Sequence, residues 1–251
     1  MLLASSVAAQ TIQTLETLPA VLNENSGMVA YSSNTFYFIN DGGNAASIYR
    51  YDTISKIANE IIVRNASNVD WEDLAQDKSG NLYIGDFGNN DNNRSNLAIY
   101  KVGNPELAGD TMNADTIQFI YENQSAFPPS SNLLNFDCEA MIWYEDSLYL
   151  FTKNRTNPFD GWCYMYVLPD AAGSYNARLK DSFQFPGSAK EFEWITAADY
   201  SYVGKELILL SSGKMHLFEA GELGDDFFSG THTTFDFGHF SQKEAIAFST
   251  D

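Results

Sequence analysis

The stretch Asn68–Asn90 reads NVDWEDLAQDKSGNLYIGDFGNN, and it decides the fold. Two short apolar runs, 74–75 and 82–85, flank a turn at 78–81 that contains Gly and Asn. Short apolar runs on either side of such a turn are typical of a β-hairpin. Acidic residues precede the first run, and Asp86 with two asparagines follows the second. The hairpin therefore brings both polar clusters to its open end, opposite the turn.

The composition suits one all-β domain. Of the 251 residues, 44% are apolar and 14% are aromatic, which is enough to build a core. Helical periodicity is scarce, whereas turn residues recur at short intervals. Because no linker or shift in composition marks a boundary, we expect residues 10–251 to form a single domain.

The net charge of the protein limits which partners it can bind. The chain has 14 basic and 33 acidic residues, for a net charge of −19. Such a field repels nucleic acid and anionic membrane surfaces, so we expect neither as a partner. The acidity suits solubility outside the cell, or the binding of cations.

The first ten residues, MLLASSVAAQ, resemble the end of a secretory signal peptide. Leu2 and Leu3 would belong to its apolar region, and residues 7–9 supply small side chains before a cut at Gln10. The basic region that should come first is missing, so either the sequence begins inside a longer gene or this segment is not a signal. We expect residues 1–9 to be a signal remnant of a secreted, periplasmic or cell-surface protein. No other stretch is apolar for long enough to span a bilayer.

The two cysteines leave the redox state open. Cys138 and Cys163 could pair in an oxidising compartment. Two buried free thiols are an equal alternative, because spacing alone does not decide between them.

The first strand of the quoted unit recurs along the chain. Its copies are Ser26-Gly27-Met28-Val29, Glu72-Asp73-Leu74-Ala75, Glu139-Ala140-Met141-Ile142, Thr196-Ala197-Ala198-Asp199 and Glu244-Ala245-Ile246-Ala247. The repeat starts are 46, 67, 57 and 48 residues apart. Second strands are expected at 35–39, 82–84, 147–151 and 206–210, third strands at 48–51, 98–102, 164–167 and 216–218, and weaker fourth strands at 116–121 and 182–185.

Four strands per unit at this period are the signature of a β-propeller. Five repeat starts favour five blades, and six is the alternative if a whole blade lies beyond Asp251. The fifth unit stops after its first strand, so we expect the last blade to be cut short.

Propeller geometry predicts a polar mouth. The start of each innermost strand and the end of the next strand lie on the same face of the disc. The starts of the innermost strands contribute Asp70, Glu72, Asp137, Glu139 and Glu244, and the ends of the second strands contribute Asn40, Asp41, Asp86, Asn89 and Lys153. Ser26 and Thr196 take the corresponding positions in the other two units.

Carboxylates at such a mouth point to a cation. A Glu directly before a buried strand is costly unless it is paired or solvated. Oxygen ligands suit calcium, which takes six to eight, and clustered carboxylates also raise one another's pKa, which suits acid–base chemistry. The glutamates could instead bind neighbouring backbone, and Asp or Asn at strand ends often caps turns. The candidates are Glu72, Glu139 and Glu244 as metal ligands, the same three with Lys153 for catalysis, and Asp41, Asp70, Asp86, Asn89 and Asp137 for ligand binding.

Other chemistry has little support in the sequence. There is no nucleophile-elbow motif, no phosphate loop, and no Cys or His spacing fit for zinc. The three histidines, His216, His232 and His239, are expected in surface or packing roles. The four tryptophans are expected in the core between blades, although Trp162 could touch a sugar ring.

At these residues the chain resembles a family of exported bacterial β-propeller proteins of mostly unassigned function. The shared pattern stands here as Ser26-Gly27, Asn40-Asp41-Gly42-Gly43, Asp70-Trp71-Glu72-Asp73, Gly85-Asp86-Phe87-Gly88, Glu139-Ala140, Thr152-Lys153 and Glu244-Ala245-Ile246-Ala247. The strands that begin with Glu are more loosely similar to calcium-dependent propeller phytases, to phytase-like esterases and to SdiA-regulated propellers. The resemblance implies a propeller and leaves the activity open.

Three functions remain. The leading hypothesis is an exported, monomeric propeller that binds a cation, a small polar, carbohydrate or phosphate ligand, or both, with no catalysis established. The second is a calcium-assisted, phytase-like or esterase-like hydrolase, and the third is a protein-interaction scaffold. The phytase hypothesis meets an objection, because a polyphosphorylated ring needs several Lys or Arg. Only Lys153 falls at the mouth, with Arg94 and Arg155 on nearby loops.

Overall fold

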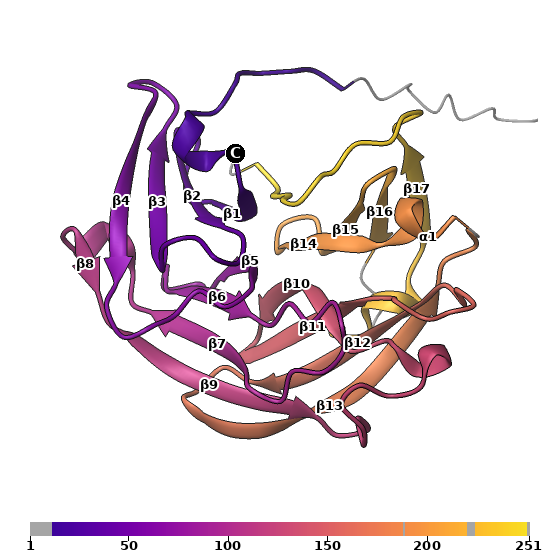
Figure 1. Cartoon of the computed structure of the whole chain (residues 1–251). Coiled ribbons are helices and arrows are strands. Elements are labelled where there is room, and N and C mark those ends of the chain that lie inside the picture. Colours follow the sequence, from indigo (N-terminus) through magenta and orange to yellow (C-terminus); the bar gives the residue numbers. More distant parts are fainter. Residues whose placement is uncertain (1–11, 188, 220–223, 250–251) are drawn as a thin grey trace, which may run out of the picture.

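The computed structural model describes residues 12–187, 189–219 and 224–249, and the expected signal remnant 1–9 lies outside them. Strands of four blades are arranged around a common centre (Figure 1). The helices of the described residues are single turns, none long and apolar enough to cross a membrane. They are α1 (Lys190–Glu193), η1 (Ala20–Leu22), η2 (Pro105–Leu107), η3 (Ser131–Leu133) and η4 (Phe227–Ser229).

Each blade is a four-stranded antiparallel meander. Blade 1 comprises β1 (Asn25–Ala30), β2 (Thr35–Asn40), β3 (Ser47–Asp52) and β4 (Ile57–Val63). Blade 2 comprises β5 (Trp71–Gln76), β6 (Leu82–Asp86), β7 (Leu97–Val102) and β9 (Ala114–Tyr121), and the short β8 (Thr111–Met112) pairs with β4. Blade 3 comprises β10 (Asp137–Tyr144), β11 (Ser147–Lys153), β12 (Trp162–Pro169) and β13 (Gly173–Gln184). Blade 4 comprises β14 (Ile195–Ser201), β15 (Glu206–Ser211), β16 (Lys214–Glu219) and β17 (His232–Asp236).

The hairpin of the quoted stretch forms as the sequence predicts. Strands β5 and β6 pair from Trp71 opposite Asp86 to Gln76 opposite Leu82. Asp77 fixes the turn between them, since its Oδ1 accepts hydrogen bonds from the backbone N–H of Ser79 and Asn81. Side-chain bonds of this kind favour a turn over continued strand. The all-β, four-stranded-blade prediction is confirmed.

The core consists of apolar layers between neighbouring blades. Strands β1, β5, β10 and β14 lie innermost and next to one another (Figure 1). Trp71 and Ile39 belong to the layer shared by blades 1 and 2, and Trp143 belongs to the layer shared by blades 2 and 3. Phe151 and Leu209 belong to the layer between blades 3 and 4. Burying both faces of each blade holds the inner strands, and the residues at their ends, in place.

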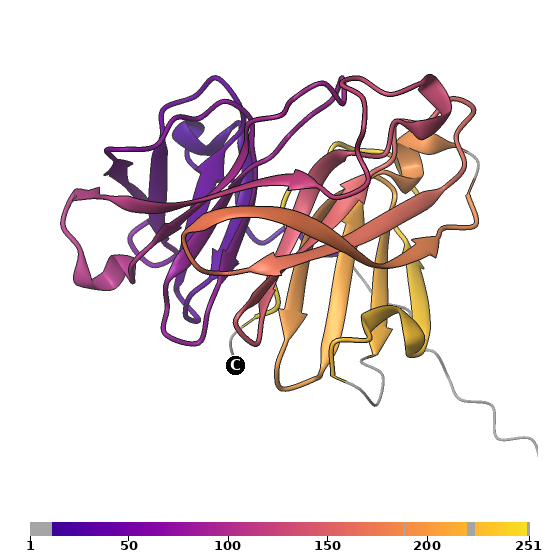
Figure 2. The same cartoon turned by 90° about the horizontal axis from the view of Figure 1, so that it is seen from below.

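The outer strands differ from the prediction. The fourth strand of blade 3 was expected at 182–185, but β13 begins at Gly173 and is 12 residues long. Its first residues run parallel to β9, with Gly173 opposite Ile117 and Ala177 opposite Tyr121. The two strands cross one flank of the molecule side by side (Figure 2). This pairing covers the edge that each outer strand would otherwise expose, and it joins blades 2 and 3 into one eight-stranded sheet.

The fifth repeat start lies beside blade 4 without forming a strand. Residues 244–247 have no strand partner. The Thr196 hydroxyl nevertheless donates to the Lys243 carbonyl, and the Phe248 N–H donates to Asp199 Oδ2. The described residues thus contain four complete blades, and a total of five or six stays a prediction.

The cysteines are both buried free thiols. Burial raises the pKa of Cys138 well above its ordinary value and that of Cys163 to about 12, so both stay protonated at neutral pH.

Candidate functional site

The innermost strands of the four blades share a β-bulge near their starts. In β1, β5, β10 and β14 the register with the neighbouring strand shifts at equivalent positions. The residues at these shifts are Ser26, Glu72, Glu139 and Thr196. A bulge leaves one residue unpaired, bends the strand and redirects a side chain. Each blade therefore presents its repeat-start residue at the axis.

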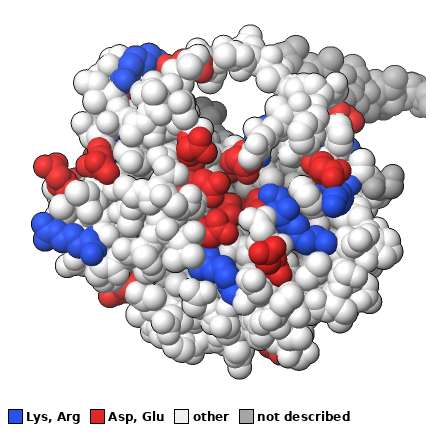
Figure 3. All heavy atoms as spheres, viewed as in Figure 1, with Lys and Arg blue, Asp and Glu red and all other residues white. Residues whose placement is uncertain are grey.

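A cavity of about 480 Å³ opens at this end of the axis. It is lined by Asn23, Glu24, Asn25, Ser26, Asp41, Asp70, Glu72, Asn90, Glu139, Lys153, Gln242 and Glu244. Acidic side chains gather around the centre of this face, with basic side chains close by (Figure 3). The lining is almost entirely polar, so a ligand here would be bound by hydrogen bonds and charge.

The predicted site residues divide into two groups. Glu72, Glu139 and Glu244, which come from three separate repeats, line this one cavity together with Asp41, Asp70 and Lys153. Asp86, Asn89 and Asp137 are buried and do not line it.

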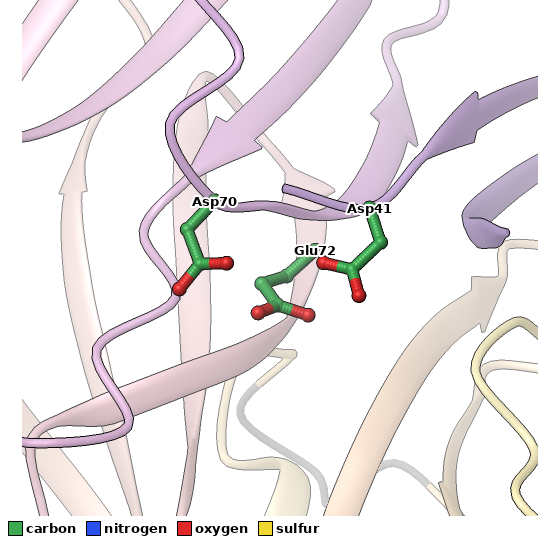
Figure 4. Close-up of side chains that lie close together, drawn as sticks. All are labelled: Asp41, Asp70 and Glu72. Carbon is green, nitrogen blue, oxygen red and sulfur yellow. The ribbon is translucent and has the colours of Figure 1, made fainter. Parts of the chain in front are cut away.

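Three carboxylates form a compact cluster on one side of the cavity. Asp41 follows β2, Asp70 precedes β5, and Glu72 is the bulge residue of β5 (Figure 4). One carboxylate oxygen from each lies within 4.8 Å of the others. Glu72 is only 7% exposed, yet its carboxylate accepts no hydrogen bond and forms no ion pair among the described residues. The cluster thus contains a buried acid with no partner.

Burial and neighbouring acids raise the pKa of two members of this cluster, Asp70 and Glu72. Burial, then Asp41 and Asp137, raises the pKa of Asp70 to about 6. Burial, then Glu139 and Asp137, raises the pKa of Glu72 well above its ordinary value. Each carboxylate therefore disfavours the charge of the next, unless a cation lies among them.

Two glycines leave room for this cluster. A β-carbon on Gly42 would lie 2.6 Å from Asp70 Oδ1, and one on Gly88 would collide with the carboxylates of both Asp70 and Glu72. Glycine at these positions lets the backbone approach the acids closely. Gly42, directly after Asp41, and Gly88, two residues after Asp86, thus leave space for the carboxylates of this cluster.

Glu139, which also lines the cavity, is held by ion pairs. Glu139 pairs with Lys153 through Oε2 and with Arg155 through Oε1, the latter at 3.2 Å. Arg155 Nε also lies 2.7 Å from Asp137 Oδ2. Burial and Asp137 nevertheless raise the pKa of Glu139 to about 8, so the two cations only partly offset the cost of burying its charge.

Asp86 and Asn89 hold backbone in place. Asp86 Oδ1 accepts hydrogen bonds from the N–H of Asp70 at 3.0 Å and from Arg94 at 2.9 Å. The backbone N–H of Asn89 donates to Asp137 Oδ1 at 2.7 Å, and its side-chain amide donates to the Phe136 carbonyl. These contacts orient the loop after β6 beneath the cavity.

A second buried acid, which was not among the candidates, links the innermost strands. Asp73 is 1% exposed and follows the bulge of β5. Its Oδ2 accepts hydrogen bonds from the N–H of Met141 in β10, at 2.7 Å, and of Ala198 in β14, at 3.4 Å. Its Oδ1 accepts from the N–H of Leu74 at 2.8 Å. Innermost strands have one unpaired edge, and Asp73 supplies acceptors for N–H groups of three blades.

A fixed offset from the repeat starts identifies two cavity residues, Glu24 and Gln242, that were not among the candidates. Two positions before each repeat start stand Glu24, Asp70, Asp137, Trp194 and Gln242. Glu24, Asp70 and Gln242 line the cavity. Asp137 binds Arg155, whose Cζ lies 4.4 Å from the centre of the Trp194 ring. Applying the offset of two to all five repeats would have identified Glu24 and Gln242.

No family model matches the sequence, and no curated protein is a significant match. Among solved structures, the PQQ-bound aldose sugar dehydrogenase of Streptomyces coelicolor is similar, with a TM-score of 0.55 and 10% identity over 96% of this chain and 90% of that one. The major allergen of Malassezia sympodialis is also similar, with a TM-score of 0.58 and 11% identity over 89% of this chain and 83% of that one. At such low identity these similarities establish the fold alone, that of a β-propeller.

Proposed function

We propose that the axial cavity binds a calcium ion through Asp41, Asp70 and Glu72, and that the ion helps to hold a small polar ligand. The observation that carries this proposal is Glu72, whose side chain is 7% exposed. Its carboxylate faces the cavity, has no partner among the described residues, and has an oxygen within 4.8 Å of those of two other acids. A carboxylate that is mostly removed from water and has no partner is unfavourable, whereas a bound cation would compensate its charge.

The donor set favours a hard cation. Calcium is bound by carboxylate oxygens at 2.3–2.6 Å, so oxygens on opposite sides of one ion lie roughly 5 Å apart. The 4.8 Å limit of the cluster fits this span. Three carboxylates supply part of the six to eight oxygens that calcium takes, and water or a ligand in the cavity would supply the rest.

This assignment shifts the expected metal ligands. Glu139 is engaged by Lys153 and Arg155, so Asp41 and Asp70 take its place beside Glu72. Glu244 and Lys153 face the same cavity and are proposed to contact the organic ligand. Export, which residues 1–9 suggest, would favour a calcium site with a dissociation constant of about 10⁻⁴–10⁻³ M.

Calcium is expected to stabilise the wild-type protein, and Glu72→Gln is expected to abolish that response. At 100 times the dissociation constant, a single site adds about 2.7 kcal/mol. For a chain of this length that corresponds to an increase in Tm of roughly 5–10 °C. In chelator, Glu72→Gln should be at least as stable as wild type, because it removes a buried charge that has no partner. Thermal unfolding with calcium titrated to about 100 mM, which is 100 times the weaker of the two dissociation constants, measures both effects.

Asp115→Asn is the matched control, because Asp115 is exposed, has no side-chain hydrogen bond or ion pair among the described residues, and loses the same charge. It should keep the full calcium response. An unchanged wild-type Tm at about 100 mM calcium, or an equal response in Glu72→Gln, would refute the proposal. A loss of stability of Glu72→Gln in chelator would instead indicate a structural role for this residue.

A second candidate function is metal-assisted hydrolysis of phosphate or carboxylate esters. The specific observation in its favour is Glu139, whose pKa of about 8 lets it exchange a proton near neutral pH at the wall of the same cavity. Hydrolysis of generic phosphoesters or acyl esters should then require calcium and fall at least about 100-fold in Glu139→Gln. Absence of activity from the wild type with calcium would leave binding without catalysis. Activity that is unaffected by Glu139→Gln would exclude Glu139 as the catalytic acid or base.

A further inference from the structure

A second cluster of metal-binding side chains lies on blade 4, apart from the axial cavity. It consists of His216 on β16 with His232 and Thr234 on β17. His216 lies directly opposite Thr234 in the register of these strands, and His232 lies opposite Phe218. Because side chains two residues apart in a strand share a face, all three project from the same face of blade 4.

Three side-chain atoms of this cluster converge. His216 Nδ1 lies 3.1 Å from His232 Nε2, and Thr234 Oγ1 lies 3.3 Å from each of these nitrogens. The metal–nitrogen distance in zinc sites is 2.0–2.1 Å, so two ligands of a tetrahedral ion are roughly 3.3 Å apart. The three atoms therefore have the spacing of one face of a zinc coordination tetrahedron.

Without a metal, the three atoms can form a hydrogen-bonded network. His216 Nδ1 can donate to Thr234 Oγ1 while the Thr234 hydroxyl donates to His232 Nε2. A cation placed among the three atoms would replace this network and accept a lone pair from every one of them.

One side of the His216, His232 and Thr234 cluster faces solvent. His216 is buried and its ring lies 4.3 Å from that of Phe185, whereas His232 is partly exposed and Thr234 is exposed. A bound ion would therefore have a buried imidazole beneath it and solvent on the other side, where water could complete the tetrahedron.

We propose that His216, His232 and Thr234 form a zinc site that is independent of the axial cavity. Imidazole nitrogens suit zinc, and the two rings would bind through Nδ1 and Nε2 respectively. Binding through Nδ1 places the proton of His216 on Nε2, which is buried without a hydrogen-bond partner among the described residues. Since second-shell partners of zinc-bound histidines strengthen binding, we expect weaker affinity than that of a three-histidine site.

Isothermal titration of the tag-free protein with zinc chloride, in a non-coordinating buffer with saturating calcium, tests the proposal. We expect one saturable zinc site, lost in His232→Ala and weakened in Thr234→Val. His239→Ala is the matched control, because His239 is an exposed histidine outside the cluster, and it should bind like wild type.

Imidazole ¹⁵N NMR of the wild type gives a readout that needs no variant. Zinc should shift the ring signals of His216 and His232 and leave those of His239 unchanged. The proposal is wrong if zinc binding is absent, if His232→Ala binds zinc as wild type does, or if only His239 responds. Glu72→Gln should retain the zinc site, so failure of the calcium proposal and failure of this one are distinguishable.

Discussion

Asp73→Ala is expected to lower the free energy of unfolding by at least about 3 kcal/mol, because each buried donor left without an acceptor costs about 1–3 kcal/mol. The substitution removes the acceptor for the N–H groups of Leu74, Met141 and Ala198, which belong to three different blades. The innermost strands would lose the side chain that links them at the axis. Urea denaturation of the two proteins measures the difference.

The pH dependence of this loss has a definite sign. Burial raises the pKa of Asp73 well above its ordinary value of 3.8. Its contribution to stability is therefore fully present below that value and is lost as the pH rises through the folded-state pKa. The deficit of Asp73→Ala should thus be larger at pH 5 than at pH 8. Asp115→Asn should show no deficit, and a wild-type stability of Asp73→Ala at pH 5 would contradict the linking role.

Arg155→Met is expected to destabilise the protein by about 3 kcal/mol or more at pH 8, since removing one partner of a buried ion pair strands the other charge. Arg155 is the cation shared by Asp137 and Glu139, which are 0% and 3% exposed. Methionine keeps much of the side-chain volume beside Trp194 while removing the charge. The measurement is again urea denaturation.

The stability deficit of Arg155→Met is expected to depend on pH in the opposite direction to that of Asp73→Ala. The pKa of Glu139 is about 8 against an ordinary value of 4.5, and Arg155 holds it lower than burial alone would. A protonated carboxyl does not need the guanidinium, so the deficit should shrink as the pH falls from 8 towards 4.5. Glu139→Gln in the Arg155→Met background should restore part of the stability. A deficit that is equal at pH 5 and pH 8, with no restoration, would show that the Glu139 charge is not responsible, and would leave the Asp137 ion pair or packing as the cause.

The positions of the strands could be predicted from the sequence, because they depend on interactions between residues close together in the chain. The hairpin of Trp71–Gln76 and Leu82–Asp86 follows from two apolar runs and a turn that Asp77 closes. The second and third strands of the four described blades follow in the same way. The parallel pairing of β13 with β9 did not follow, because it joins residues more than 50 positions apart and depends on how neighbouring blades twist.

The roles of the acids were harder to predict than their location. Glu72 and Glu139 occupy equivalent bulges, yet Glu139 is paired with two cations and Glu72 has no partner among the described residues. The inner strands do not distinguish these glutamates, because the difference comes from Lys153 and Arg155, at the end of β11 and just beyond it in the same repeat as Glu139. Asp73 was not predicted, because the N–H groups of Met141 and Ala198 that it binds lie in other blades. These strands approach Asp73 only when the blades are arranged around the axis.

The sequence alone determined that the chain repeats a hairpin led by polar residues, and that its acidic ends gather around an axis, because turn chemistry and the period of the repeat are local properties. Only the tertiary structure decided which acids lie at the cavity surface and which are buried beneath it. Burial depends on neighbours contributed by other blades, and the position of counter-charges depends on how the loops after β6 and β11 fold back on their own blades. These contacts set whether a given carboxylate binds backbone, pairs with a cation of the chain, or is left for a ligand.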